Sequence, residues 1–211
     1  MEKTTESLPK MKEMLFTLIL EDEWKAFEMG NRILKKIRKD EKEETNQRKI
    51  LEDILDDTRR CMRDRFPWIV HFENISYEKS QCDLGWELFE FLEKMTGIVK
   101  KYRLDKINGS TQEIVEEIAD NIEDRKTLST VAKKLGIEKE DMSRLLKKRI
   151  GTSAADYCNL LKMEKAAAYL KEYGMDVIQV ADKLGYVSKE SFGKVFREKI
   201  GCRPEHYRKY E

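Results

Sequence analysis

One short motif occurs twice in this chain, and the repetition constrains the fold more than any other feature of the sequence. The two copies are VAKKLG at Val131–Gly136 and VADKLG at Val180–Gly185, which agree in five of six letters across an offset of 49 residues. Each copy is followed by a basic segment with apolar residues at helical spacing, at residues 138–151 and 187–201. The sequence therefore predicts that the same unit of two helices is built twice.

Residues that favour the start and the end of a helix flank each motif. Thr127 and Asp176 are expected as N-caps, because their side-chain oxygens can accept hydrogen bonds from first-turn amides. Gly136 and Gly185 are expected in the left-handed conformation that ends a helix. Small residues that permit a close helix crossing lie on both apolar faces, at Ala132 and Ala181.

A single long helix is predicted between the two copies, over residues 153–173, with Ser153 as its cap and Gly174 at its end. At ~1.5 Å per residue this connector would be about 30 Å long. A helix, a tight turn and a second basic helix form the helix-turn-helix pattern, whose second helix enters the major groove of DNA. Two such recognition helices on one face of a duplex lie about 34 Å apart. The connector therefore has roughly the length needed to place them in successive major-groove segments.

The remainder of the chain also predicts helices, so the expected fold class is all-α. No stretch alternates apolar and polar residues between turn signals, as a β-sandwich or barrel would. The turn signal Asn108-Gly109, followed by a capping box at residues 110–113, marks a domain boundary. We expect a helical bundle at 1–107 and a two-unit helix-turn-helix domain at 110–211. Bundle helices are expected at residues 8–20, 23–38, 49–65 and 83–102, with an irregular aromatic segment at 66–77.

Charge is distributed unevenly along the chain. Residues 125–209 hold 20 Lys and Arg against 11 Asp and Glu, whereas residues 1–124 hold 22 against 29. This asymmetry favours an anionic partner for the C-terminal part, although charge alone fits an ordinary solvated helical surface equally well. No apolar run approaches the roughly 18 residues needed to cross a bilayer. Because the first ten residues carry no signal-peptide pattern, we expect a cytoplasmic protein without membrane contact.

Motifs that carry chemistry are not found in the sequence. No paired carboxylates, nucleophile with a base, or phosphate-cradling glycine loop occurs, so an enzyme is not predicted. The cysteines form no C-x-x-C pair and have no zinc-ligand spacing with the two histidines, so neither a metal nor another cofactor is predicted. These cysteines are Cys61, Cys82, Cys158 and Cys202.

The second copy and the residues that close it resemble a known family. The segment VADKLGYVSKESFGKVFREKIGCRPEHYR at Val180–Arg208 is similar to the DNA-binding domain of AraC/XylS-type bacterial transcription regulators. Its closing G-x-x-P-x-x-Y-R pattern lies at Gly201, Pro204, Tyr207 and Arg208. The resemblance extends over residues 110–209 and implies a sequence-specific DNA-binding transcription regulator. The helical N-terminal domain replaces the strand-rich sugar-binding barrel common in that family, so direct sugar sensing is not expected.

The resemblance also implies which side chains face DNA. The base-facing residues would be Lys139, Glu140, Ser143, Arg144, Lys189, Glu190, Gly193 and Lys194. The phosphate contacts would be Lys147, Lys148, Arg149, Arg197, Lys199 and Arg203, which add affinity without sequence information. Among the first set, Arg144 and Lys194 are the best candidates for reading bases, because a basic side chain can donate to guanine O6 and N7.

Two features depart from a favourable DNA-binding surface. Three acids, Glu138, Glu140 and Asp141, crowd the start of the first recognition helix, where they would face a polyanion. Gly193 removes a side chain from the second recognition helix. Glu140 either accepts a hydrogen bond from cytosine N4 or weakens the first unit. The alternative function is a helical adaptor or inhibitor that retains the fold and binds another protein.

The N-terminal domain is expected to dimerise, to sense a small molecule or to contact a partner protein such as RNA polymerase. Such an effector pocket would be lined by aromatic side chains, although aromatic residues at helical spacing more often form a core. The candidates are Trp24, Trp68, Trp86, Phe66 and Phe72.

Overall fold

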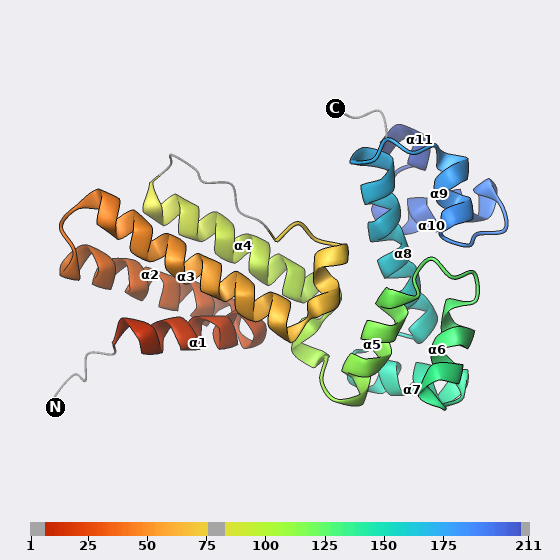
Figure 1. The fold of residues 1–211 in the computed structure, drawn as a ribbon, viewed down its shortest axis with the longest axis horizontal. Coiled ribbons are helices and arrows are strands. Elements are labelled where there is room, and N and C mark those ends of the chain that lie inside the picture. The colour runs from red at the N-terminus through yellow and green to blue at the C-terminus, as the bar shows by residue number, and fades with distance from the viewer. Residues whose placement is uncertain (1–6, 76–82, 208–211) are drawn as a thin grey trace. The chain divides into compact units, whose positions relative to one another are not determined.

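The computed structural model describes residues 7–75 and 83–207, and the chain divides into two compact units, residues 1–105 and 106–211 (Figure 1). The described residues form helices and contain no strand, so the all-α prediction is confirmed. Cys82 and Arg208, as well as residues 76 and 77 of the aromatic segment, lie outside the described residues.

The N-terminal unit is built on four long helices with a 3-10 segment between the third and the fourth. Side chains from all four helices fill its core, including the fully buried Leu15, Ile33, Leu55 and Met95. The elements are α1 (Leu8–Glu21), α2 (Glu23–Asp40), α3 (Glu44–Arg65), η1 (Pro67–His71) and α4 (Leu84–Tyr102), followed by a short 3-10 turn η2 (Leu104–Lys106).

Helix α3 begins at Glu44, five residues before the expected start at residue 49, so that prediction was wrong at its N-terminal end. Glu41 explains the early start. Its carboxylate accepts hydrogen bonds from the backbone amides of Lys42 (2.7 Å) and Glu43 (3.0 Å), which turns the chain sharply between the two helices. The charged residues 39–48, between the two expected helices, are therefore mostly helical.

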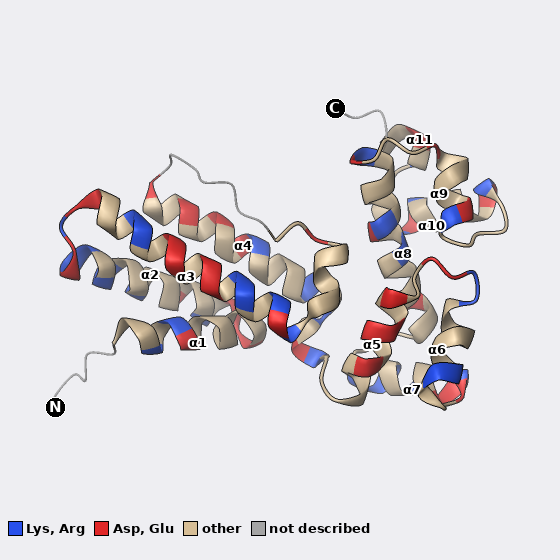
Figure 2. Cartoon of the chain, in the orientation of Figure 1, with Lys and Arg blue, Asp and Glu red and all other residues tan. Residues whose placement is uncertain are grey.

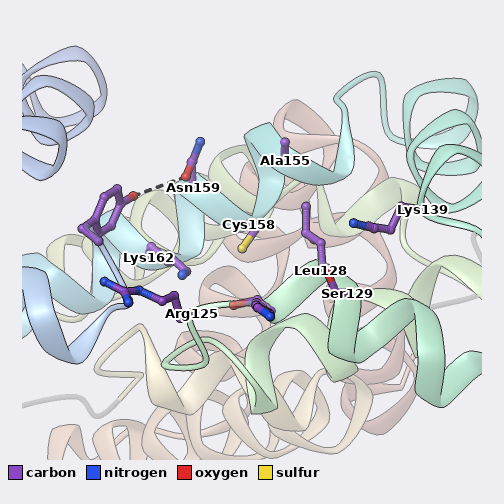
Figure 3. A pocket seen from close by; sticks show the side chains of 12 residues that line it. Arg125, Leu128, Ser129, Lys139, Ala155, Cys158, Asn159 and Lys162 are labelled. Carbon is purple, nitrogen blue, oxygen red and sulfur yellow. Dashed lines mark hydrogen bonds between the residues drawn. The ribbon is translucent and has the colours of Figure 1, made fainter. Parts of the chain in front are cut away.

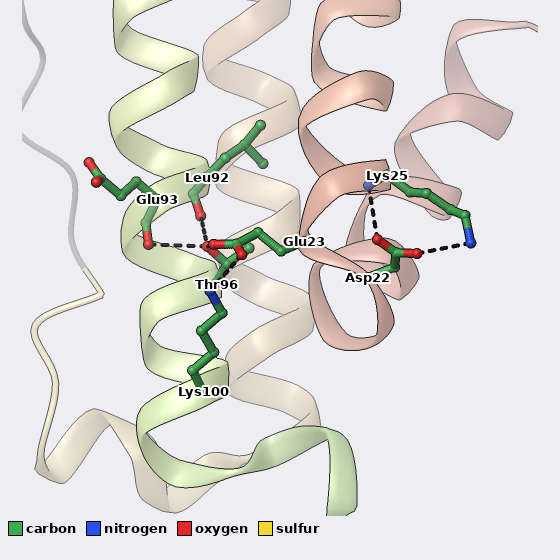
Figure 4. A network of polar contacts seen from close by, with 7 residues as sticks. All are labelled: Asp22, Glu23, Lys25, Leu92, Glu93, Thr96 and Lys100. Carbon is green, nitrogen blue, oxygen red and sulfur yellow. Dashed lines mark hydrogen bonds and ion pairs between the residues drawn. The ribbon is translucent and has the colours of Figure 1, made fainter.

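Helices α2 and α4 pack closely and are joined by a polar network (Figure 4). A Cβ atom at Gly30 would lie 2.8 Å from Leu92 Cδ1, so a larger residue there would have to displace the Leu92 side chain. At one end of the contact, Glu23 accepts hydrogen bonds from Thr96 Oγ1 (3.3 Å) and Lys100 Nζ (2.5 Å). The Lys100 hydrogen bond lowers the pKa of Glu23, which therefore stays ionised and keeps the pair charged.

The aromatic residues separate into a core group and a surface group. Trp68 and Phe66 are buried, and the Trp68 ring lies 5.7 Å from that of Tyr102 in an edge-on arrangement, as a core residue would. Trp24 and Trp86 are 79% and 54% exposed, so the expectation that the tryptophans are core is wrong for these two. The predicted aromatic residues thus do not line one common pocket.

The C-terminal unit contains the two repeated helix pairs and the helix that joins them. The first helix-turn-helix packs at one end of α8 and the second at the other, with α5 against the first (Figure 1). The elements are α5 (Ser110–Asp120), α6 (Thr127–Leu135), α7 (Lys139–Arg149), α8 (Ala154–Lys171), α9 (Val177–Lys183), α10 (Lys189–Ile200) and α11 (Pro204–Tyr207).

The connector prediction is confirmed as helix α8, which has 18 residues and is therefore about 27 Å long at ~1.5 Å per residue. Ser153 caps it by accepting a hydrogen bond from the Asp156 amide (3.1 Å). Gly136 and Gly185 have φ values of 65° and 75°, as expected for residues that end a helix. Ala132 and Ala181 are buried, in agreement with the predicted close crossings.

Two of the predicted helix caps were wrong. Thr127 lies inside α6, and its hydroxyl instead donates to the Asp124 carbonyl (2.6 Å), because the preceding turn folds back onto the helix. The capping box at 110–113 is also absent, since the α5 N-cap is Gly109 at a positive φ of 47° and carries no side-chain bond. The Thr111 hydroxyl stabilises the turn instead, because it accepts from the Asn108 amide and donates to the Asn108 carbonyl. Asp176, by contrast, caps α9 as predicted and forms a capping box with Gln179.

Candidate nucleic-acid interface

Helix α7 presents a charged face opposite its buried one. Met142 and Leu146 are fully buried, because they pack into the first helix-turn-helix at a spacing of one helical turn. Of the predicted DNA-facing residues of this helix, only Ser143 is half-buried. The exposed ones are Lys139, Glu140, Arg144, Lys147, Lys148 and Arg149.

Two predicted base-facing residues of α7 are held by contacts within the protein. Ser143 Oγ accepts a hydrogen bond from the Ala154 amide (3.3 Å), which fixes the end of the first helix-turn-helix against the start of α8. Arg144 forms an ion pair with Asp141, one turn earlier on the same exposed face. Because both partners are largely exposed, this pair is worth only about 0–1 kcal/mol and does not prevent Arg144 from binding elsewhere.

Helix α10 is anchored by aromatic residues and begins with a well-formed cap. Phe192 and Phe196 are fully buried, and Ser188 and Ser191 form a reciprocal capping box at the first turn. Gly193 faces open space, since a Cβ atom there would meet no atom within 4 Å. The absence of a side chain at this position therefore leaves room on the exposed face rather than relieving a clash.

A surface groove of about 680 Å³ runs along α10 and α11, which is the size of an ordinary ligand pocket. Its residues include all four predicted base-facing positions of this helix and two of the predicted phosphate contacts. The lining residues are Lys189, Glu190, Gly193, Lys194, Arg197, Glu198, Arg203, Pro204 and Glu205. The structure therefore brings the predicted residues of the second helix-turn-helix together on one surface.

Charges within this groove are partly paired. Lys189 Nζ lies 2.7 Å from Glu205 Oε1, and this contact raises the pKa of Lys189 and lowers that of Glu205. The pKa of Glu190 is lowered by hydrogen bonds from its own backbone amide and from Ser188, so all three groups are ionised near neutral pH. Lys194, Arg197 and Arg203 supply the excess positive charge. Acidic residues are instead concentrated on α5, as Figure 2 shows.

Neither a metal site nor a membrane-spanning helix is present in the part of the chain that the structure describes. Among residues 7–75 and 83–207, no group of three His, Cys, Asp or Glu side chains is arranged to hold a metal ion, and no helix is long and apolar enough to cross a bilayer. The described cysteines Cys61, Cys158 and Cys202 are free thiols, and burial raises the pKa of Cys158, which keeps it protonated and unreactive.

Comparison with known proteins identifies the family. The family described as "Helix-turn-helix domain" matches residues 131–210. The multiple antibiotic resistance protein MarA of Escherichia coli strain K12 is 30% identical over 95 residues, which are 45% of this chain and 75% of MarA. The chain belongs to the AraC/XylS family of transcription regulators. The predicted resemblance is thus confirmed, and DNA-binding transcription regulation is the function of this family.

Other relatives share the same region. The HTH-type transcriptional regulator YtdP of Bacillus subtilis is 28% identical over 145 residues, so the match spans 65% of this chain but only 17% of YtdP. The solved C-terminal domain of the response regulator AraT from Geobacillus stearothermophilus has 26% identity and a TM-score of 0.43, covering 46% of this chain and 81% of AraT's domain. No comparison favours the adaptor alternative, and the family consists of regulators rather than enzymes.

Three basic residues near the predicted interface were missed by the sequence analysis. Arg125 and Lys126 precede the first motif, and Lys162 lies in the middle of the connector. The repeat could not reveal them, because they lie outside the two copies and have no counterpart to compare. The uneven charge of residues 125–209 was the one signal that included them.

Proposed function

We propose that α7 and α10 enter two successive major-groove segments of one DNA duplex, so that a single chain reads both halves of a site. The observation that carries this proposal is the pair of equivalent helix-turn-helix elements at the two ends of α8. The length of α8, about 27 Å, is close to the ~34 Å separation of grooves on one face of DNA.

Within this proposal the side chains have distinct roles. Arg144 and Lys194 donate to base edges, because both are exposed basic side chains near the middle of a recognition helix. Ser143 acts chiefly as a packing residue, since its hydroxyl already binds the start of α8. The basic residues at the C-terminal ends of the two helices bind phosphates and set the overall affinity.

We also propose that the N-terminal unit provides regulation in the bacterial cytoplasm, through dimerisation, an effector or RNA polymerase. A groove of about 580 Å³ between α2 and α4 supports this role, because it is lined by Trp24, Phe27 and Phe89 together with carboxylates. The Phe27 and Phe89 rings lie 5.3 Å apart. An exposed aromatic surface of this kind is typical of a binding site rather than of a solvated face.

Selection of bound duplexes from a random pool tests the DNA-binding proposal. The wild-type protein should enrich a site with two preferred segments about one helical turn apart. Arg144→Ala should relax preference in one segment and Lys194→Ala in the other, with a loss of about 1–3 kcal/mol of discrimination at the affected base pair. Melting temperatures should remain near the wild-type value, since both side chains are exposed. Enrichment of no sequence, or of one segment only, would contradict the two-groove arrangement.

A further inference from the structure

A basic pocket of about 360 Å³ lies between the two helix-turn-helix elements of the C-terminal unit (Figure 3). Four cationic side chains line it, namely Arg125, Lys126, Lys139 and Lys162, and no carboxylate is among the lining residues. Its remaining wall is formed by the first turn of α6, the N-terminal half of α8 and the turn that follows α9. This composition fits an anion.

Lys162 forms the buried end of the pocket. Its side chain is only 7% exposed, and its ammonium group donates to the carbonyls of Leu184 (2.7 Å) and Asp124 (3.4 Å). Burial lowers the pKa of Lys162, because desolvation penalises the charged form. An ammonium group has three donors, so one remains for a ligand after these two carbonyls are satisfied. A bound anion would also compensate the buried charge.

The other three cations are not committed to acids. Arg125, Lys126 and Lys139 have no ion pair with any carboxylate of residues 7–75 or 83–207. Cations elsewhere in the same unit do have such partners, as Lys183 has in Glu123 (3.0 Å). The nearby Asp124 uses its carboxylate to accept from Thr130 and from the Lys126 amide, which holds the turn before α6. The pocket therefore combines an excess of positive charge with few internal acceptors.

The pocket lies between the points at which the two recognition helices begin. Lys139 is the first residue of α7, and Gly185 and Tyr186 belong to the turn that leads to Ser188, the N-cap of α10. The two elements meet closely here, since a Cβ atom at Gly185 would lie 2.5 Å from Arg125 Cα. In helix-turn-helix proteins the N-terminal residues of the recognition helix approach the bases, so the surface between two such ends faces the DNA between the two groove segments.

We propose that this pocket binds backbone phosphate of the DNA segment between the two major-groove contacts, as a sequence-independent central anchor. Arg125, Lys126 and Lys139 bind the phosphate oxygens, while Lys162 holds the two helix-turn-helix elements together behind them. The inference rests on the proposed DNA-binding function. A free phosphate-like anion has the same chemistry, so the test must distinguish DNA backbone phosphate from an anion free in solution.

The test compares two double variants that remove the same charge. Arg125→Ala/Lys126→Ala removes two exposed cations of the pocket, whereas Lys35→Ala/Lys49→Ala removes two exposed cations of the N-terminal unit. Binding to the selected duplex is measured as a function of salt. The slope of log K against log salt should become shallower by about 1–2 in the pocket variant, at about 0.9 per phosphate contact, and should not change in the control. The sequences selected from a random pool should remain those of the wild type.

Phosphate ethylation interference gives the position of the contact. Ethylation midway between the two groove segments should block binding of the wild type and of the control, but not of the pocket variant. Equal slopes and equal interference in the two variants would overturn the inference while leaving the DNA-binding proposal intact. A wild type with a flat salt response would overturn the DNA-binding proposal itself. Inorganic pyrophosphate tests the other source of the anion. If it stabilises the wild type but not the pocket variant, and the two proteins have the same slope of log K against log salt, the pocket binds a free anion and the inference about DNA phosphate is overturned.

Discussion

The two helix-turn-helix elements share a backbone plan but differ in what fills it. The first has an aliphatic core around Met142 and Leu146, whereas aromatic rings fill the second. Phe196 is central there, with ring centroids 5.5 Å from both Phe192 and Tyr207. The same positions are thus buried in both copies, but the apolar residues that occupy them differ. A helix crossing requires apolar volume rather than one particular residue.

The starts of the two recognition helices differ as well. The α10 N-cap is Ser188, whose side chain accepts a hydrogen bond from a first-turn amide, whereas the α7 N-cap, Glu138, makes no such bond. The first turn of α7 also carries two acids, Glu140 and Asp141, against one in α10. The second element is therefore better capped at the end proposed to meet DNA, and the first is electrostatically less favourable toward a polyanion.

The largest effect is expected from the aromatic core of the second element. Phe196→Ala should lower the free energy of unfolding by about 3–5 kcal/mol, because it removes a fully buried ring and leaves a cavity. Urea unfolding followed by circular dichroism measures the loss. Ile178→Ala is the control, since Ile178 is 56% exposed on α9 and its truncation should cost at most about 0.5 kcal/mol. Similar losses in the two variants would show that the ring cluster does not hold the second element together.

A smaller effect distinguishes the caps of the two opening helices. Asp176→Ala should cost about 1 kcal/mol, because its side chain accepts from a first-turn amide of α9. Lys126→Ala, at the equivalent N-cap of α6, should change stability by less than about 0.5 kcal/mol, since Lys126 makes no side-chain cap bond. Thermal melts of the two variants provide the comparison. A loss at Lys126 as large as that at Asp176 would mean that the two helices start in the same way.

The smallest effect concerns the acidic start of α7. Asp141→Asn removes one negative charge and frees Arg144 from its ion pair, so affinity for random duplex DNA should rise about two- to fivefold, which corresponds to roughly 0.4–1 kcal/mol. Fluorescence anisotropy at fixed salt measures this change. Glu172→Gln, an equal change of charge at the exposed end of α8, should have no effect. An unchanged affinity in Asp141→Asn would indicate that the first element lies away from DNA.

Much of the C-terminal unit could be predicted from the sequence because its determinants are local. The repeated motif, the left-handed glycines Gly136 and Gly185 and the cap Ser153 each act within a few residues of the helix they limit. Exposure of the proposed DNA-facing residues followed from the same helical periodicity. A residue such as Arg144 must be exposed if Met142 and Leu146 are buried.

The failures arose where distant or competing groups decide the outcome. Thr127 has a side chain suited to an N-cap, but Asp124 forms the turn before α6 instead. The Asp124 carboxylate accepts from the Lys126 amide, and its carbonyl accepts from the Thr127 hydroxyl. Trp24 and Trp86 lie on helices with an apolar face yet are exposed, and the close contact between α2 and α4 is instead made by Gly30 against Leu88 and Leu92. The burial of Lys162 depends on carbonyls 22 and 38 residues away, which no local pattern reveals.

Because α8 joins two helix-turn-helix elements that differ from each other, the proposed DNA site has a direction. A symmetric dimer reads the same from either strand, whereas a chain with an aliphatic, acid-flanked element followed by an aromatic one does not. Turning such a site end for end along a promoter would carry the N-terminal unit to the opposite side of it. Orientation, and not only occupancy, would then decide which neighbouring molecule the regulator meets.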